Sequence, residues 1–185
     1  MRSRSLLAVS LAVVLAACVA GNNSQEKRAN VQKMKEDTLA KLYQTEPSSR
    51  DHVRSAVGYG VFSNVGVNLI LLSGGGGWGV VRDNRSGRDT YMNMGSGGIG
   101  LGLGVKDFRG VFVFTSAGAL EQFVNGGWDG SAQADAAAVA TGKGGAWAGA
   151  VDVAPGIKLY QITESGLALQ ATIQGTKYWK DDELN

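Results

Sequence analysis

Few residues of this chain have the types and spacing that catalysis requires. His52 is the only histidine, and no nucleophile is identified beside it, so we expect a solvated or helix-capping residue. Gly95, Gly97 and Gly100 have G-x-G-x-x-G spacing, but no helix follows them, as dinucleotide binding would require. One histidine and one cysteine cannot supply the usual four ligands of a zinc site. We therefore expect a non-enzymatic protein without metal or cofactor, and the alternative is a hydrolase that uses His52.

Five basic residues lie in or beside two predicted turns. Arginine is well suited to lipid phosphate because its planar guanidinium donates two parallel hydrogen bonds. Asp83 and Asp89 lie among these residues and can neutralise them. The cluster is therefore either a solvated loop or a lipid-headgroup site. The candidate headgroup residues are Arg82, Arg85, Arg88, Lys106 and Arg109.

The single cysteine, Cys18, stands where a lipid-modification reaction would use it. The preceding residues 15–17 are Leu-Ala-Ala, which together with Cys18 resemble a bacterial lipobox. At a lipobox the leader is cut off, and fatty acyl groups such as palmitate are attached to the cysteine thiol and the new amino terminus. We therefore predict that Cys18 is lipidated. The alternative is an ordinary signal peptide that happens to be followed by a cysteine.

The residues around Cys18 predict where the chain is delivered. Residues 1–17 have the charged start, apolar run and small terminal residues of a signal peptide. The apolar run is shorter than the roughly 20 residues that a membrane-spanning helix needs. Residues 18–24 are expected to be a short lipidated tether. Because Val19 and not Asp follows the cysteine, the pattern favours the outer membrane, on its periplasmic side.

The charge balance argues against nucleic acid as a partner. The chain has 18 Lys and Arg against 16 Asp and Glu, but Arg2 and Arg4 belong to the leader. The mature chain thus has 16 basic and 16 acidic side chains, with no net charge. A domain without a basic excess lacks the electrostatic feature on which binding to a phosphate backbone depends.

Residues 98–105 alternate glycine with an aliphatic residue, so that one face of a strand there would carry no side chains. Interior glycine is tolerated where another backbone, a bulge or a ligand comes close. One interpretation is sharp curvature or a crossing strand, and the other is a groove for an acyl chain. The groove candidates are Gly98, Gly100, Gly102 and Gly104.

Two helices are predicted first and a β-rich region after them. Apolar residues recur every three or four positions over 25–43, which is typical of an amphipathic helix. A second short helix is expected over 50–56, with Ser48 or Ser49 as its cap, and a third over 116–124. Strands are predicted at 57–62, 66–72, 78–83, 90–94, 98–105, 110–115, 131–141, 146–154, 157–163 and 166–175.

These elements predict an α+β fold that is mainly β. The amino-terminal helices pack on a curved, mostly antiparallel, glycine-rich sheet or barrel-like sandwich. A polar hairpin loop is expected at 83–89 and tight turns at 154–156 and 164–166. At roughly 100–200 residues per domain, the length indicates one domain, over 25–185.

Residues 56–65 read A-V-G-Y-G-V-F-S-N-V and resemble the opening A-x-G-x-x-V-F-P-x-V of the SYLF domain family. Ser63 stands at the usual proline. The order of the later motifs is similar too, over roughly residues 30–180. These motifs are the glycine-rich 74–79, the segment 80–83, the alternating 95–105, the segment 112–123, the alanine-rich 131–141, Tyr160 and Gly166-Leu167.

The SYLF resemblance implies a lipid-binding domain. Eukaryotic members associate with phosphoinositides and actin, and bacterial members are often secreted lipoproteins. We therefore expect a phospholipid-associating lipoprotein of the outer membrane, with phospholipid as its partner through the acyl anchor and the domain. The alternative is a structural or protein-interaction module of the cell envelope, for which the anchor supplies location only.

The lipobox interpretation makes a direct prediction about Cys18. Replacing Cys18 by Ser removes the thiol that accepts the acyl group, so we expect no lipidation and release of the protein from the membrane fraction. Metabolic labelling with a fatty-acid analogue, followed by fractionation, measures both effects. Unchanged labelling of the Cys18→Ser chain would refute the prediction.

Overall fold

The fold is that of a computed structural model, which describes residues 19–69, 72–99, 104–130, 147–163, 166–168 and 176–185. Cys18, Gly100, Gly102 and the strand predicted at 131–141 lie outside these described residues. The same holds for most of the strand predicted at 166–175.

Three helices form where the sequence predicts them. α1 covers Ser24–Thr45, and the side chain of Asn23 caps it by accepting from the Glu26 backbone N–H. α2 covers Ser49–Ser55; its cap residue Ser48 makes no capping hydrogen bond through its side chain. α3 covers Ala117–Glu121 and continues as a π-helical turn, η1, over Gln122–Gly126. Among the described helices, none is long and apolar enough to cross a membrane.

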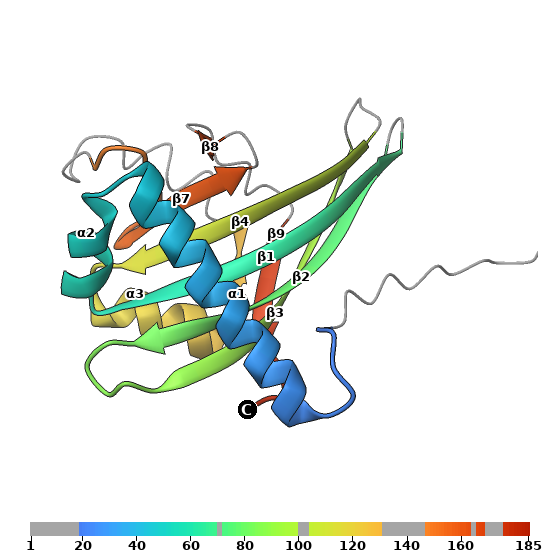
Figure 1. Cartoon of the computed structure of the whole chain (residues 1–185), viewed down its shortest axis with the longest axis horizontal. Helices are drawn as coiled ribbons and strands as arrows, with labels where there is room; N and C mark the ends of the chain where they lie inside the picture. Colours follow the sequence, from blue (N-terminus) through green and yellow to red (C-terminus); the bar gives the residue numbers. More distant parts are fainter. Residues whose placement is uncertain (1–18, 70–71, 100–103, 131–146, 164–165, 169–175) are drawn as a thin grey trace, which may run out of the picture.

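The strands form one antiparallel sheet, and the predicted α+β class is confirmed (Figure 1). The order in the sheet is β5-β9-β3-β2-β1-β4-β7-β6, and β8 pairs with β7. The strands are β1 (Gly58–Leu69), β2 (Leu72–Asp83), β3 (Asp89–Ile99), β4 (Gly104–Phe114), β5 (Trp128–Asp129), β6 (Val151–Ala154), β7 (Ile157–Thr163), β8 (Gly166–Ala168) and β9 (Thr176–Lys180).

Several predicted strand boundaries were wrong, and the strand expected at 146–154 begins only at Val151, as β6. The strands expected at 57–62 and 66–72 are mainly one continuous strand, β1. The strand expected at 98–105 is divided, because Gly98 lies in β3 and Gly104 begins β4. A period of two predicts extended backbone but does not show where the chain reverses direction. The alternating segment is therefore not one bare-faced strand.

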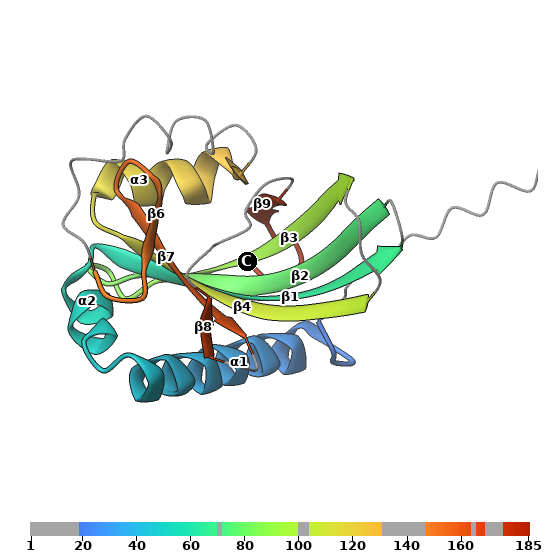
Figure 2. The same ribbon diagram turned by 90° about the horizontal axis from the view of Figure 1, so that it is seen from above.

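One face of the sheet is covered by α1, as Figure 2 shows. Val31 and Leu42 of the helix are fully buried, together with Val61, Val80 and Val111 of the three central strands. The helix therefore packs across the middle of the sheet, and its apolar stripe is used within the domain.

The opposite face carries an aromatic core beneath α3 and η1. Its ring centroids lie between 4.8 and 6.0 Å apart, mostly in edge-on or tilted arrangements, which aromatic pairs prefer. The part of the sheet that lies between α1 and the α3–η1 segment is thus covered on both faces. The members are Phe62, Phe112, Phe114, Phe123, Trp128 and Tyr178.

The residues just before α1, which belong to the tether expected at 18–24, are packed on the domain. Val19 is 6% exposed and belongs to the core under α1. The Asn30 side chain donates to the Ala20 carbonyl at 2.6 Å, and the Asn22 backbone N–H donates to Glu26. A buried apolar side chain and these hydrogen bonds fix the segment against the helix. Cys18 is therefore one residue away from the folded core.

Gly79 is required by the packing of the aromatic core. A Cβ at Gly79 would meet the Val61 carbonyl oxygen and the ring of Phe62, whose Cγ would be 2.7 Å away. Phe62 stands opposite Gly79 in the β1–β2 register and fills the space above it.

We expect Gly79→Ala to destabilise the domain by about 1–3 kcal/mol, because an added carbon in a full site forces its neighbours to move. Gly118→Ala in α3 is the matched control, since no heavy atom lies within 4 Å of its new Cβ. Alanine is the better helix former, so the control is neutral or stabilising by up to about 1 kcal/mol. Thermal unfolding measures both, and equal melting temperatures would contradict the close approach.

Candidate functional site

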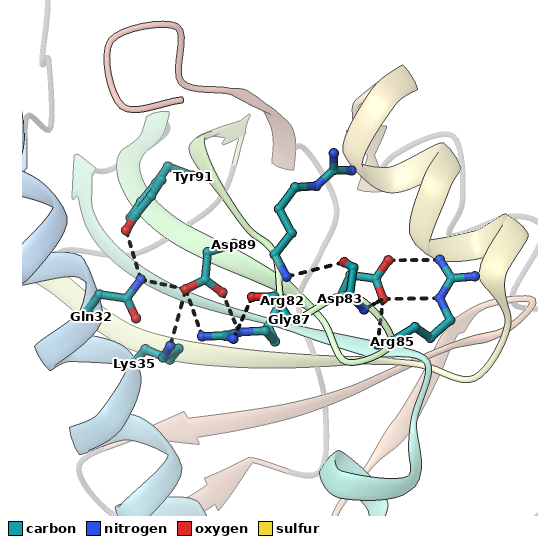
Figure 3. Close-up of polar contacts among 10 residues, drawn as sticks. Gln32, Lys35, Arg82, Asp83, Arg85, Gly87, Asp89 and Tyr91 are labelled. Carbon is teal, nitrogen blue, oxygen red and sulfur yellow. Dashed lines mark hydrogen bonds and ion pairs between the residues drawn. The ribbon is translucent and has the colours of Figure 1, made fainter.

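The first candidate site is the arginine loop, and its centre is the carboxylate of Asp89 (Figure 3). Arg82 Nε lies 2.6 Å from Asp89 Oδ1, and its Nη2 donates to Oδ2 at 3.0 Å. From α1, Gln32 donates to the same Oδ2 at 2.9 Å and Lys35 Nζ lies 3.8 Å from it. Arg82 is therefore neutralised within a network that joins β2, β3 and α1.

Lys35 adds a second cation to this network. Its side chain is 7% exposed, and burial lowers its pKa while the nearby Asp89 carboxylate opposes that shift. Two basic side chains thus share one carboxylate under the helix. The arrangement holds α1 on the sheet, and Arg82 already has a carboxylate partner in it.

Arg85 is neutralised in the same way by Asp83. Its guanidinium donates to both oxygens of Asp83, at 3.2 and 2.9 Å. These side-chain hydrogen bonds are the main cause that lowers the pKa of Asp83 to about 2. Glu121 of α3 lies 3.8 Å from the same guanidinium. Arg85 therefore faces acidic groups and is not available as a free headgroup ligand.

Arg88 is exposed at the rim of a shallow groove between the loop and α3. Its floor is apolar and its rim carries both signs of charge. The residues that line it include Val81, Leu120 and Val124 on the floor, and Asp83, Arg88 and Glu121 on the rim.

The five basic candidates do not form one site. Arg109 lies on the α1 face and donates to the Thr38 hydroxyl at 3.2 Å. Its partner on β1 is Ser63, whereas the partner of Arg82 is Tyr59, and four residues of strand span about 13 Å. Lys106 lies farther along β4, among residues whose side chains are not described.

Two of the four candidate glycines lie within the described residues. Gly98 and Gly104 lie on different strands, β3 and β4, which are separated by β2 and β1 in the sheet. Gly100 and Gly102 lie outside the described residues.

His52 has specific partners, so the solvated or capping role expected for it was wrong. Its Nδ1 and the Tyr160 hydroxyl lie 2.6 Å apart, and its ring stacks on Trp147 at 4.0 Å. Burial raises the pKa of Tyr160 to about 12, so the phenol keeps its proton. The contacts join α2, β7 and the segment before β6. Tyr160 lies 108 residues away in the chain, which is why sequence reasoning missed the pair.

Trp179 on β9 is a surface residue that sequence reasoning did not identify. It is 47% exposed and is the one large apolar side chain exposed among the described residues. Its indole lies over Gly95 of β3, with ring carbons 3.2 and 3.4 Å from where a glycine Cβ would be. The alternation of Thr176–Lys180 could have revealed it, since Tyr178 is buried and its neighbour must face the other way.

Trp78 shares this face of the sheet. Trp78 pairs with Asn93, and Asn93 pairs with Trp179. The two tryptophans are thus about 10 Å apart across the sheet, since neighbouring strands lie about 4.8 Å apart. Trp78 is half-buried at the margin of the α1 core, to which Val19 also belongs. Within the described part of the chain, no group of three metal-ligating side chains comes together.

The Asp89 network predicts different outcomes for replacing Asp89 and for replacing Lys35. Asp89→Asn leaves the Arg82 and Lys35 charges without their carboxylate, so we expect it to lower the free energy of unfolding by roughly 2–4 kcal/mol. Lys35→Met keeps the Arg82 pair and removes a buried charge, so we expect a change below about 1 kcal/mol or a gain.

The pH dependence provides a second check. Because the pKa of Lys35 is lowered in the folded state, the unfolded chain binds more protons as the pH approaches 10.5, and the stability contributed by this residue rises there. Urea denaturation against pH measures this rise, and we expect it to be absent in Lys35→Met. A large loss of stability in Lys35→Met would contradict this account.

Comparison with known proteins gives one informative similarity. No family model matches the chain. Over 161 residues the chain is 33% identical to "Beta cell expansion factor A" of Aeromonas veronii, an alignment that covers 87% of this chain and 60% of that protein. The chain therefore corresponds to about three-fifths of the length of that relative.

Proposed function

We propose that this chain is a non-enzymatic, phospholipid-associating lipoprotein of the bacterial outer membrane that faces the periplasm, with a SYLF-like domain over residues 25–185. The observation that carries the proposal is the exposed indole of Trp179 on the α1 face of the sheet. Tryptophan is enriched at membrane surfaces because its ring has a large apolar body and a polar N–H. The lipobox-like residues 15–18 supply the anchor.

The position of Val19 also supports a membrane on the α1 side of the domain. Val19 is buried under α1. Because consecutive Cα atoms lie about 4 Å apart, an acyl chain on Cys18 would be attached next to a residue whose position is fixed. The first turns of α1 also contact the residues that follow β9, since Arg28 donates to the Leu184 carbonyl at 2.8 Å. The anchor and Trp179 therefore lie toward the same face of the domain.

Apolar contact is the main source of affinity in this proposal. The mature chain has no net charge, and Arg82 and Arg85 already have acidic partners. Headgroup recognition by the arginine loop is thus reduced to the exposed Arg88. Binding by an apolar face is weakly sensitive to salt, in contrast to binding that depends on exposed charges.

The alternative is a structural or protein-interaction module with the anchor for location only. The groove beside Arg88 favours this alternative, because it has an apolar floor and a rim of mixed charge. Non-obligate protein interfaces have a similar composition.

Vesicle sedimentation of the mature chain with Cys18→Ser separates the two functions, because no acyl group then contributes. We expect binding to phospholipid vesicles that persists at high salt. Trp179→Ala should weaken it about tenfold, since burying a large side chain contributes roughly 1.5–3 kcal/mol, and Arg88→Ala should leave it unchanged. A chain that does not sediment with any vesicle supports the interaction module, and loss of binding in Arg88→Ala alone supports the headgroup site.

A further inference from the structure

The central four strands extend beyond the rest of the domain. β4 pairs with β7 only over Arg109–Phe114, and β3 pairs with β9 only over Met92–Ser96. Beyond these points, residues 64–69, 72–77, 97–99 and 104–108 have partners only within β1 to β4 among the described strands. We call this four-stranded part the distal extension. In Figures 1 and 2 it projects past the end of α1.

The pairing register decides which residues share a face of the distal extension. Val61 of β1 lies on the α1 face of the sheet, and every second position along a strand returns to the same face. Val65, Val67 and Leu69 are therefore positions of the α1 face. The opposite face takes the positions of Gly66 and Asn68.

Successive rows across the α1 face change in character toward the tip. The first row contains Trp78 and Trp179. The next has Asp107 at one end and the paired Lys177 and Asp129 at the other, with glycine and Val65 between them. The two outermost rows contain only aliphatic residues and glycine among their described positions. These are Val67, Leu69, Leu72, Gly74, Gly97, Ile99 and Val105.

The opposite face of the same two rows is polar or bare. Its described positions are Gly66, Asn68, Ser73, Gly75, Ser96, Gly98, Gly104 and Lys106. The distal extension is therefore amphipathic across its thickness, and the apolar side is the α1 side, where Val19 is buried.

We infer that the α1 face of the distal extension enters one leaflet of the phospholipid membrane, with the aliphatic positions of its two outermost rows toward the hydrocarbon and the tryptophan row at headgroup level. This inference rests on the proposed function and names the surface that performs it. Two rows of an extended sheet span about 7 Å, within the depth of roughly 5–10 Å that interfacial segments reach. The order from the tryptophan row and the charged row to the aliphatic rows matches the order from headgroup to acyl chain.

The position of the anchor selects a membrane over a protein as the occupant. Residues 19–23 lie at the end of α1 on the α1 side of the sheet (Figure 2), so acyl chains on Cys18 and the apolar rows face the same bilayer. A protein partner on this face would have to compete with a membrane held beside it by the anchor.

Site-specific fluorophores test the inference on the full acylated chain in phospholipid vesicles. Cys18 is the only cysteine and its sulfur is consumed by the anchor, so Val67→Cys and Asn68→Cys each supply one free thiol. The two positions are adjacent in β1 and on opposite faces. With a polarity-sensitive nitrobenzoxadiazole label, we expect the probe at 67 to shift to the blue and to be quenched several-fold more by quenchers on the acyl chains than the probe at 68.

Each other outcome has a distinct meaning. Equal quenching at 67 and 68, or no quenching of either in a chain that floats with the vesicles, overturns the inference and leaves the lipoprotein intact. If the chain does not float with the vesicles and the fluorophore has reacted with Cys18 itself, the thiol of Cys18 was free and carried no acyl group. That result overturns the proposed function and the inference together. Near-ultraviolet circular dichroism of both labelled chains establishes that each is folded.

A second pair of variants removes any effect of the label. In the mature chain with Cys18→Ser, Val67→Asp should weaken vesicle binding at least about tenfold, because a charge in hydrocarbon is costly. Asn68→Asp places the same charge one residue away on the other face and should have little effect. Equal loss in both variants would show that insertion is not specific to this face.

Discussion

The buried carboxylate of Asp89 is the interaction on which the arrangement of the domain depends. It pairs with Arg82 on the neighbouring strand and accepts from Gln32 of α1, with Lys35 beside it. Removing two cations from water is costly unless an anion faces them, so the helix has one low-energy position across the sheet. That position sets where α1 begins, and with it the place of Val19. The contact of Asp89 with Gln32, which lies about 13 residues after Val19, therefore also determines where an anchor would leave the domain.

Glycine has two different physical roles in this sheet. At Gly79 the missing side chain is replaced by Phe62, so the glycine permits an aromatic core directly against the backbone. At Gly95 the replacement is the indole of Trp179 on the other face. Farther along the same face, Gly74 and Gly97 alternate with aliphatic positions in the distal extension. A face made of small and aliphatic residues is smooth and has little conformational entropy to lose when it contacts lipid.

The sequence predicted local structure better than the site. The α1 helix, the loop at 83–89 and the α3 helix depend on residues close together in the chain, whose pattern determines the outcome. The division of 98–105 between two strands depends on pairing with β2 and β1, which no periodicity contains. Neutralisation of the loop arginines was foreseeable because Asp83 and Asp89 lie close to them in the chain. The contact between His52 and Tyr160 was not foreseeable. The exposed Trp179 follows from alternation once Tyr178 is known to be buried, and that burial is a tertiary fact.

An anchor and a weak apolar face are more effective together than either alone. A single acyl chain gives marginal membrane binding, and a second signal makes attachment stable. In the proposed arrangement, an acyl group on Cys18 makes contact of the face with lipid intramolecular, so even modest apolar affinity would keep it engaged. The groove between Arg88 and α3 lies on the face of the sheet opposite α1, so the same arrangement would turn it toward the periplasm. The two candidate functions therefore use opposite faces, and a protein partner at the groove would meet a domain whose orientation the membrane has already fixed.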